Sequence, residues 1–128
     1  MKITLIAERI FDGEYFHQDV PVTVEDGHIL AFDTVVGAKE IRQAGTLVPG
    51  FIDVQVNGGG GALFNADPSV NCIETIGRAH ARFGTTGFLP TLITDDVSVM
   101  ANAADAVAEA LVKGSAGVLG VHFEGPHL

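Results

Sequence analysis

After Pro49, three short apolar segments alternate with two segments whose apolar residues recur at helical spacing. The apolar segments run over residues 51–56, 88–93 and 118–124, so their starts lie 37 and 30 residues apart. The first helical segment begins at Asp67-Pro68, an N-cap followed by proline at the first helical position, and ends at Gly84. The second begins after Thr94 or Asp95 and ends at Gly114. This alternation predicts a parallel sheet built from βαβ units.

Each predicted helix carries an apolar stripe that can bury itself against the sheet. In the first helix the stripe consists of Val70, Ile73, Ile76 and Phe83. In the second it consists of Val97, Met100, Ala104, Val107 and Leu111.

Residues 1–48 have a different character and predict a small antiparallel β region. Apolar segments at 20–25 and 28–32 flank Asp26-Gly27, a strong signal for a type I′ hairpin, and Phe11-Asp12-Gly13 marks a second turn. The change of pattern near Pro49 therefore predicts two parts, 1–48 and 49–128.

The spacing of the later strands fits a (β/α)8 barrel, which averages roughly 31 residues per unit. An open, doubly wound sheet fits the same spacing. The polar faces of the strands favour the barrel, because parallel strands buried on both faces read as continuous apolar runs. Asp53, Gln55 and Asn57 share one face of the first strand. His122 and Glu124 share one face of the third strand, opposite Leu119, Val121 and Phe123.

Polar residues also collect where the three strands end, which is the catalytic face of α/β barrels. They are Gln55 and Asn57, Thr94 and Asp95, and His122 and Glu124. Glu124, held before Gly125-Pro126, is the best single candidate; the alternative is a carboxylate that caps a loop or pairs with an arginine.

The histidines leave more than one interpretation open. His122 is a ligand, a residue that supports a ligand, or a hydrogen-bonded core histidine. His127 follows the Gly-Pro turn and lies on the loop surface or lines the site. His17, His28 and His80 occur in hairpin or helix contexts and are expected to be structural or exposed.

The run Gly58–Gly61 lacks the lysine of a phosphate-binding P-loop and the spacing of a dinucleotide-binding loop. We expect it to form a flexible wall that lets the backbone approach a ligand.

Charge and composition exclude several classes of protein. The net charge is −9 and there is no basic run, so a nucleic-acid partner is not expected. No apolar stretch approaches the roughly 20 residues that span a bilayer, so no membrane partner is expected. The single cysteine, Cys72, cannot form an internal disulfide, and the chain is expected to be cytoplasmic.

Three motifs, in order along the chain, carry a family resemblance. They are residues 49–61, PGFIDVQVNGGGG; residues 85–94, TTGFLPTLIT; and residues 121–128, VHFEGPHL. The first resembles the opening barrel strand of the amidohydrolase superfamily, and together they resemble the N-acetylglucosamine-6-phosphate deacetylases. The resemblance implies an α/β fold: the N-terminal part of a (β/α)8 amidohydrolase barrel, with three strands and two helices in residues 49–128, preceded by strands of a small β-sandwich domain.

The resemblance also implies a chemistry. In that family one divalent metal, usually zinc, activates water to attack the acetamide of a phosphorylated amino sugar, which yields glucosamine 6-phosphate and acetate. Glu124 would ligate the metal, and Gln55, Asn57, His122 and His127 would line the pocket. Many amidohydrolases carry His-x-His where this chain has Gln55-Val56-Asn57, and neutral amides are poor zinc ligands beside imidazole. A single metal is therefore expected.

The family's two ligating histidines, its catalytic aspartate and most of its sugar contacts would lie beyond Leu128. The chain would then be the N-terminal part of a longer enzyme, inactive alone, and a homo-oligomer of the complete protein stays open. Two alternatives remain: another amidohydrolase, whose His-x-His sign is absent here, and a non-catalytic folding or dimerisation fragment.

Overall fold

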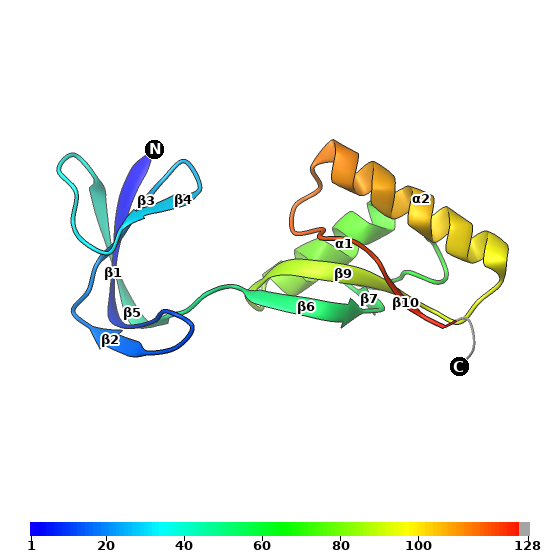
Figure 1. Ribbon diagram of the computed structural model, residues 1–128, viewed down its shortest axis with the longest axis horizontal. Helices are drawn as coiled ribbons and strands as arrows, with labels where there is room; N and C mark the ends of the chain where they lie inside the picture. Colours follow the sequence, from blue (N-terminus) through cyan, green and yellow to red (C-terminus); the bar gives the residue numbers. More distant parts are fainter. Residues whose placement is uncertain (126–128) are drawn as a thin grey trace. The chain divides into compact units, whose positions relative to one another are not determined.

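The computed structural model describes residues 1–125. The chain divides into two compact units, Met1–Pro49 and Gly50–Leu128, and the division falls at Pro49, where the sequence pattern changes. Figure 1 shows both units.

The first unit is a single five-stranded sheet. Its strands are β1 (Lys2–Phe11), β2 (Phe16–Gln18), β3 (Val22–Glu25), β4 (His28–Ala31) and β5 (Lys39–Leu47). They follow the order β2-β1-β3-β4, and β5 also pairs with β1. The β1–β5 pair is parallel, so the sheet is mixed and the expectation of a purely antiparallel region was wrong. The sequence pattern did not predict β5, because most of its side chains are exposed and its apolar residues do not alternate with polar ones.

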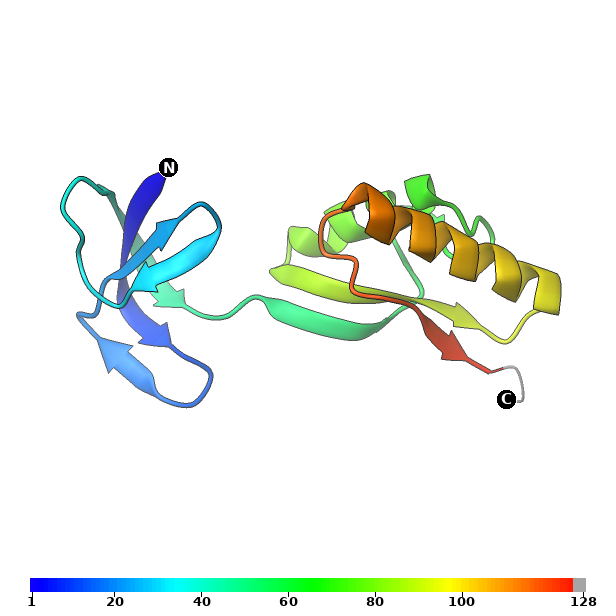
Figure 2. The ribbon, with the colours of Figure 1, turned by 45° about the horizontal axis from the view of Figure 1, so that its top comes forward.

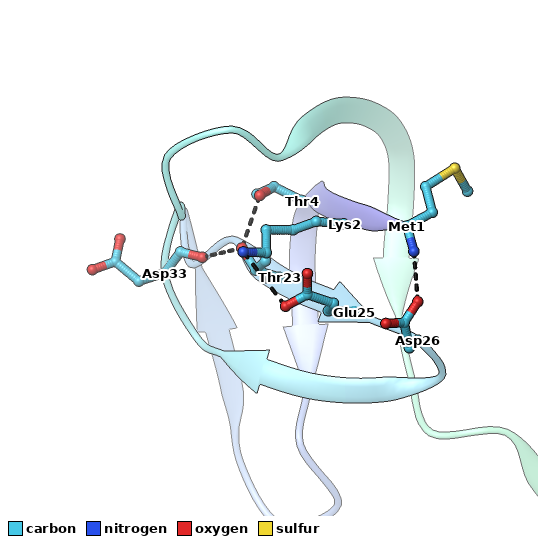
Figure 3. A network of polar contacts seen from close by, with 7 residues as sticks. All are labelled: Met1, Lys2, Thr4, Thr23, Glu25, Asp26 and Asp33. Carbon is cyan, nitrogen blue, oxygen red and sulfur yellow. Dashed lines mark hydrogen bonds and ion pairs between the residues drawn. The ribbon is translucent and has the colours of Figure 1, made fainter.

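The hairpin between β3 and β4 forms where the sequence predicts it. Asp26 and Gly27 both have positive φ, 49° and 81°, as a type I′ turn requires. The N-terminal ammonium donates to Asp26 Oδ1 at 2.6 Å, and Lys2 pairs with Glu25 at 3.4 Å, as Figure 3 shows. The first pair is exposed and the second is partly exposed, so both contribute little to stability.

A buried pair of threonines joins β1 to β3 (Figure 3). Thr4 and Thr23 are 1% and 0% exposed, and their hydroxyl oxygens lie 2.8 Å apart. The Thr23 hydroxyl donates its proton to the Asp33 carbonyl. The Thr4 hydroxyl must therefore donate to Thr23, which makes this a directed chain of hydrogen bonds.

We expect Thr23→Val to destabilise the first unit by about 1–3 kcal/mol, because it leaves the buried Thr4 hydroxyl and the Asp33 carbonyl without their partner. Urea unfolding followed through the amide signals of β1 and β3 measures this change. Thr34→Val, at an exposed threonine of the same sheet's connecting loop, is the matched control. Equal stability of the two variants would contradict the role of the pair.

The turn after β1 is built around Asp12. Its Oδ1 accepts hydrogen bonds from the Glu14 and Tyr15 amides, both at 2.8 Å, and its Oδ2 lies 2.7 Å from His17 Nε2. The Tyr15 amide, and after it the His17 side chain, lower the pKa of Asp12 from 3.8 to about 2.

This turn should weaken in acid. Because the folded pKa lies below the ordinary one, the stabilisation is complete above pH 3.8 and is lost as the pH falls through about 2. The chemical shift of the Asp12 carboxyl carbon should follow this low pKa. Asp12→Asn keeps the Oδ1 acceptor and should remove the acid dependence of the β1–β2 hairpin. An Asp12 midpoint near 3.8 would refute the assignment.

The second unit is a mixed α/β structure with two helices over a parallel sheet. The sheet contains β6 (Phe51–Val56), β9 (Thr85–Ile93) and β10 (His122–Glu124), with β9 in the centre and both of its pairings parallel. Helices α1 (Val70–Ala81) and α2 (Val97–Lys113) lie on the same face of this sheet (Figures 1 and 2). Strands β7 (Gly58–Gly59) and β8 (Ala62–Leu63) form a small hairpin.

The sequential order of β6, β9 and β10 is shared by barrels and by open sheets. Barrel closure, like the β-sandwich, therefore stays a prediction. The helices pack against the sheet and form one hydrophobic core. This core includes Val56, Phe64, Ile73, Ile76, Phe88, Leu92 and Val107. No helix in residues 1–125 is both long enough and apolar enough to cross a membrane.

Helix α1 begins at Val70, and its N-cap is Ser69, whose hydroxyl accepts from the Cys72 amide at 3.2 Å. The prediction of Asp67 as N-cap was wrong, because the Asp67 carbonyl is taken by the Ser69 amide in the preceding turn. Phe83 is 82% exposed, since it lies beyond the end of the helix and outside the buried stripe. The helix ends at Ala81 with Arg82 as C-cap, earlier than the predicted Gly84, which lies in the following turn with φ 96°.

Helix α2 begins at Val97 with Asp96 as N-cap, one residue after the predicted Asp95 and two after the predicted Thr94. Asp95 is occupied instead by a hydrogen bond from Asn65. The helix ends at Gly114 in the left-handed conformation, as predicted. Its buried face is mostly alanine and is rotated from the predicted stripe, which leaves Val97 and Leu111 exposed: it consists of Ala103, Ala106, Val107 and Ala110.

The third strand is shorter than predicted, because regular pairing begins only at His122. Phe88 donates to the Gly117 carbonyl and accepts from the Leu119 amide. Alternate residues of a parallel strand face the same neighbour, so Pro90 is the next residue of β9 to face this segment. Proline has no N–H to donate, and the ladder is interrupted there.

Candidate functional site

Polar side chains from β6 and β10 meet across the central strand. Gln55 Nε2 donates to Glu124 Oε2 at 2.9 Å. Glu124 lies at the C-terminal end of β10 and Gln55 near the end of β6, so two residues 69 positions apart in the chain form one polar pair. Within residues 1–125 the other carboxylate oxygen, Oε1, makes no hydrogen bond to a protein group, so it can bind a ligand.

The end of β6 contains a bulge. Asp53 pairs with Phe88 and Val56 pairs with Pro90, so three steps along β6 match two steps along β9. One extra residue is therefore inserted at Val54–Gln55, and a bulge of this kind redirects a side chain. Of the predicted apolar face, only Val56 is buried, whereas Ile52 and Val54 are exposed.

His122 contacts the bulge directly. Its Nδ1 lies 2.9 Å from the Val54 carbonyl oxygen, which can only accept, so Nδ1 carries the proton and donates. Val121 and Phe123, on the other face of the segment, pack against the helix-covered core, as the period of two predicts.

Asn57 lies at the edge of this group. Its side-chain amide reaches the Thr91 carbonyl at 3.5 Å, and its own carbonyl accepts from the Phe64 amide at 2.9 Å. Asn57 thus lies two residues after Gln55 in the sequence and forms a hydrogen bond with β9. His127 lies outside the described residues.

Two supporting residues were missed by sequence reasoning. Thr91, fully buried in β9, accepts from the Val56 amide at 2.9 Å and donates to the Leu89 carbonyl at 3.1 Å. Asn65 bonds both the amide and the carbonyl of Ile93, and its hydrogen bond to Asp95 lowers the pKa of that carboxyl. A threonine inside an apolar strand was the only available signal; Asn65 had none.

Gly125 shows why glycine follows Glu124. Its φ is 140°, and an added Cβ would lie 3.1 Å from the Thr94 Cα and closer still to the Thr94 side chain. The Thr94 hydroxyl donates to the Glu124 carbonyl at 3.2 Å. The end of β9 therefore packs tightly on the end of β10 and holds the Glu124 backbone.

The glycine run has a structural role in the described residues. Gly60 and Gly61 adopt positive φ in the turn between β7 and β8. A Cβ on Gly59 would lie 2.9 Å from the His80 ring, and His80 Nε2 bonds the Gly58 carbonyl at 3.0 Å. The close approach observed is thus to helix α1, and the structural interpretation of His80 is confirmed. A ligand-facing role of the glycine run stays a prediction.

The donor set fits part of a metal site. Among residues 1–125, no three His, Cys, Asp or Glu side chains lie close enough to hold a metal ion together. Glu124 can supply one oxygen, and a catalytic zinc generally takes three protein ligands and an open position.

A hollow of about 570 Å³ lies at the other end of the strands, beside Thr85 and Thr86. Glu74 on its wall pairs with Lys113 at 2.7 Å and accepts from the Ser115 hydroxyl at 2.8 Å, and Lys113 lowers the pKa of Glu74. These contacts join α1 to the end of α2, away from the Gln55–Glu124 pair.

Known proteins with similar sequences are sugar-phosphate deacetylases. No family model matches the chain. The chain is 48% identical, over 114 residues, to the N-acetylgalactosamine-6-phosphate deacetylase of Shewanella sp. (strain ANA-3), and 41% identical, over 119 residues, to the N-acetylglucosamine-6-phosphate deacetylase of Haemophilus influenzae. These matches cover 84% and 93% of the chain. The chain is therefore a homologue of the matching part of these two deacetylases.

Solved structures agree with this assignment. The crystal structure of N-acetylglucosamine-6-phosphate deacetylase from Pasteurella multocida matches all of the chain with a TM-score of 0.93 and 32% identity. The chain spans 35% of that deacetylase and 29% of each of the two relatives. The mixed α/β fold described above is therefore the fold of the matching third of that deacetylase.

Proposed function

We propose that this chain is part of a longer, metal-dependent deacetylase that hydrolyses the acetamide of a 6-phosphorylated N-acetylhexosamine. The observation that carries the proposal is the Gln55–Glu124 pair at the strand ends of a chain that is 48% identical to the matching part of such a deacetylase. The remaining metal ligands, the catalytic aspartate and the phosphate contacts would lie in the rest of the protein.

Glu124 would be a metal ligand. Gln55 donates to Oε2, which leaves Oε1 to face a cation, and the hydrogen bond fixes the plane of the carboxylate. Zinc, when bound, supplies a water with a pKa near 7 and polarises the acetamide carbonyl. Gln55 and Asn57 would line the pocket with neutral amides, which can orient a polar substrate without competing for the metal.

The identity of the hexosamine has two candidates. The sequence motifs favour N-acetylglucosamine 6-phosphate, with glucosamine 6-phosphate and acetate as products. A relative named for N-acetylgalactosamine 6-phosphate is more identical, 48% against 41%. The two sugars differ only in the configuration at C4, so both belong to one reaction class.

The test is acetate release by the complete protein that contains residues 1–128, supplied with zinc. We expect turnover of at least one of the two 6-phosphorylated sugars, little turnover of unphosphorylated N-acetylglucosamine, and loss of activity in chelator. Absence of acetate from both phosphorylated sugars would refute the proposal.

The complete protein is expected to bind one zinc per chain, because amides stand at 55 and 57 in place of the imidazoles that hold a second metal. Elemental analysis after exhaustive dialysis measures this ratio. Replacing both Gln55 and Asn57 by histidine should raise it towards two. Two tightly held zincs in the unaltered protein would contradict the prediction.

A further inference from the structure

The bulge in β6 replaces missing ladder bonds by side-chain partners. The backbone N–H of Gln55 donates to Asp53 Oδ1 at 3.1 Å, and the backbone N–H of Val56 donates to Thr91 Oγ1 at 2.9 Å. The Val54 carbonyl accepts from His122 Nδ1 at 2.9 Å. Asp53 lies on β6 itself and Thr91 on the adjacent strand, whereas His122 reaches across from β10.

His122 and Glu124 hold consecutive residues of β6. They lie two positions apart on β10 and point to the same face, where His122 bonds the Val54 carbonyl and Glu124 bonds the Gln55 side chain. The two hydrogen bonds and the two stretches of backbone, from Val54 to Gln55 and from His122 to Glu124, together form a closed ring. Moving the Val54 carbonyl would therefore move Gln55 relative to Glu124.

We propose that His122 is a positioning residue of the metal site. By its hydrogen bond to the Val54 carbonyl, it fixes the bulge that brings the side-chain amide of Gln55 into hydrogen-bonding distance of Glu124. This role rests on the proposed function, since it acts on the carboxylate proposed as a metal ligand. Residues that orient a metal ligand typically change metal affinity about 10–100-fold when they are lost.

The chemistry separates this role from direct ligation by His122. Positioning uses Nδ1–H, which the Val54 carbonyl requires, whereas ligation would use Nε2. An asparagine places an N–H close to the position of Nδ1, and a glutamine places its polar atoms near that of Nε2. The pair His122→Asn and His122→Gln therefore distinguishes the two ring nitrogens.

The first measurement is the zinc dissociation constant of the complete, metal-stripped protein, in competition with a chromophoric chelator. We expect His122→Gln to weaken zinc binding about 10–100-fold and His122→Asn to keep most of the affinity. His28→Ala is the matched control, because it removes another Nδ1-to-carbonyl hydrogen bond, to Asp26 at 3.1 Å in the first unit, and should leave zinc affinity unchanged.

The second measurement needs no metal. Amide hydrogen exchange of the peptide covering residues 51–57 should be faster in His122→Gln than in the unaltered protein, and near normal in His122→Asn. Normal exchange in both variants would overturn the proposal, even if zinc affinity changed. Retention of zinc by His122→Gln and its loss in His122→Asn would also overturn it, in favour of ligation through Nε2.

The failure of the proposed function gives a different pattern. If the unaltered protein binds no zinc, the proposed function falls, and the positioning role falls with it. If the unaltered protein binds zinc and His122→Gln binds it equally well, the positioning role alone is overturned.

Discussion

Replacing Glu124 by glutamine in the complete protein is expected to abolish zinc retention and acetate release together. The amide keeps the size of the carboxylate, and its oxygen can still accept the hydrogen bond from Gln55. It lacks the negative charge that offsets that of the metal. Because loss of a supporting residue alone costs about 10–100-fold in affinity or activity, loss of the ligand itself should exceed 100-fold.

Zinc content after dialysis, together with acetate release, measures the effect. Glu109→Gln is the matched control, since Glu109 is exposed on α2 and lies outside the polar group at the strand ends. It should behave as the unaltered protein does. Full activity of Glu124→Gln would remove Glu124 from the metal site.

Residues 1–128 alone are expected to show no deacetylase activity and to retain no zinc. Among the described residues Glu124 has no companions that complete a three-ligand group, and a single carboxylate cannot hold zinc against water and buffer. The second unit also leaves apolar side chains of β6 and of the segment before β10 uncovered, since Ile52, Val54 and Leu119 are 66%, 60% and 54% exposed. Such an exposed sheet favours aggregation.

Acetate release by purified 1–128, measured beside the complete protein at equal molar concentration with zinc supplied, tests this expectation. Circular dichroism shows whether the sample is folded. Chelator-sensitive turnover by the short chain would show that the essential ligands do not lie beyond Leu128.

Local patterns predicted much of the second unit and part of the first. The alternation after Pro49 gave the order of strands and helices, because a period of two or of 3.6 residues belongs to one element and needs no partner to be read. The Asp26-Gly27 turn was equally local, since its positive φ values favour these residues. The opposite faces of Val121 and His122 followed from the period of two.

Features fixed by distant partners were not predictable in this way. The bulge at Val54–Gln55 depends on Thr91 and His122, which lie far along the chain, and nothing in the sequence of β6 marks it. Strand β5 forms because β1 offers it an open edge, although its own residues lack alternation. Helix α1 is capped by Ser69 and not by Asp67 because the preceding turn occupies the Asp67 carbonyl.

The same distinction applies to the candidate site. The sequence placed Gln55 and Glu124 at strand ends, where polar residues of neighbouring strands meet. Their direct hydrogen bond depends on the bulge and could not be read from the spacing. The metal-binding roles remain predictions, which the structure supports by the orientation of Glu124.

Anomalous scattering at the zinc edge, from crystals of the complete protein soaked in or grown with zinc, tests the central claim most directly. The account predicts one peak per chain, about 2.0–2.2 Å from a carboxylate oxygen of Glu124, with Gln55 still bonded to the other oxygen. A zinc peak that lies away from Glu124 would contradict it, as would a second peak held at positions 55 and 57.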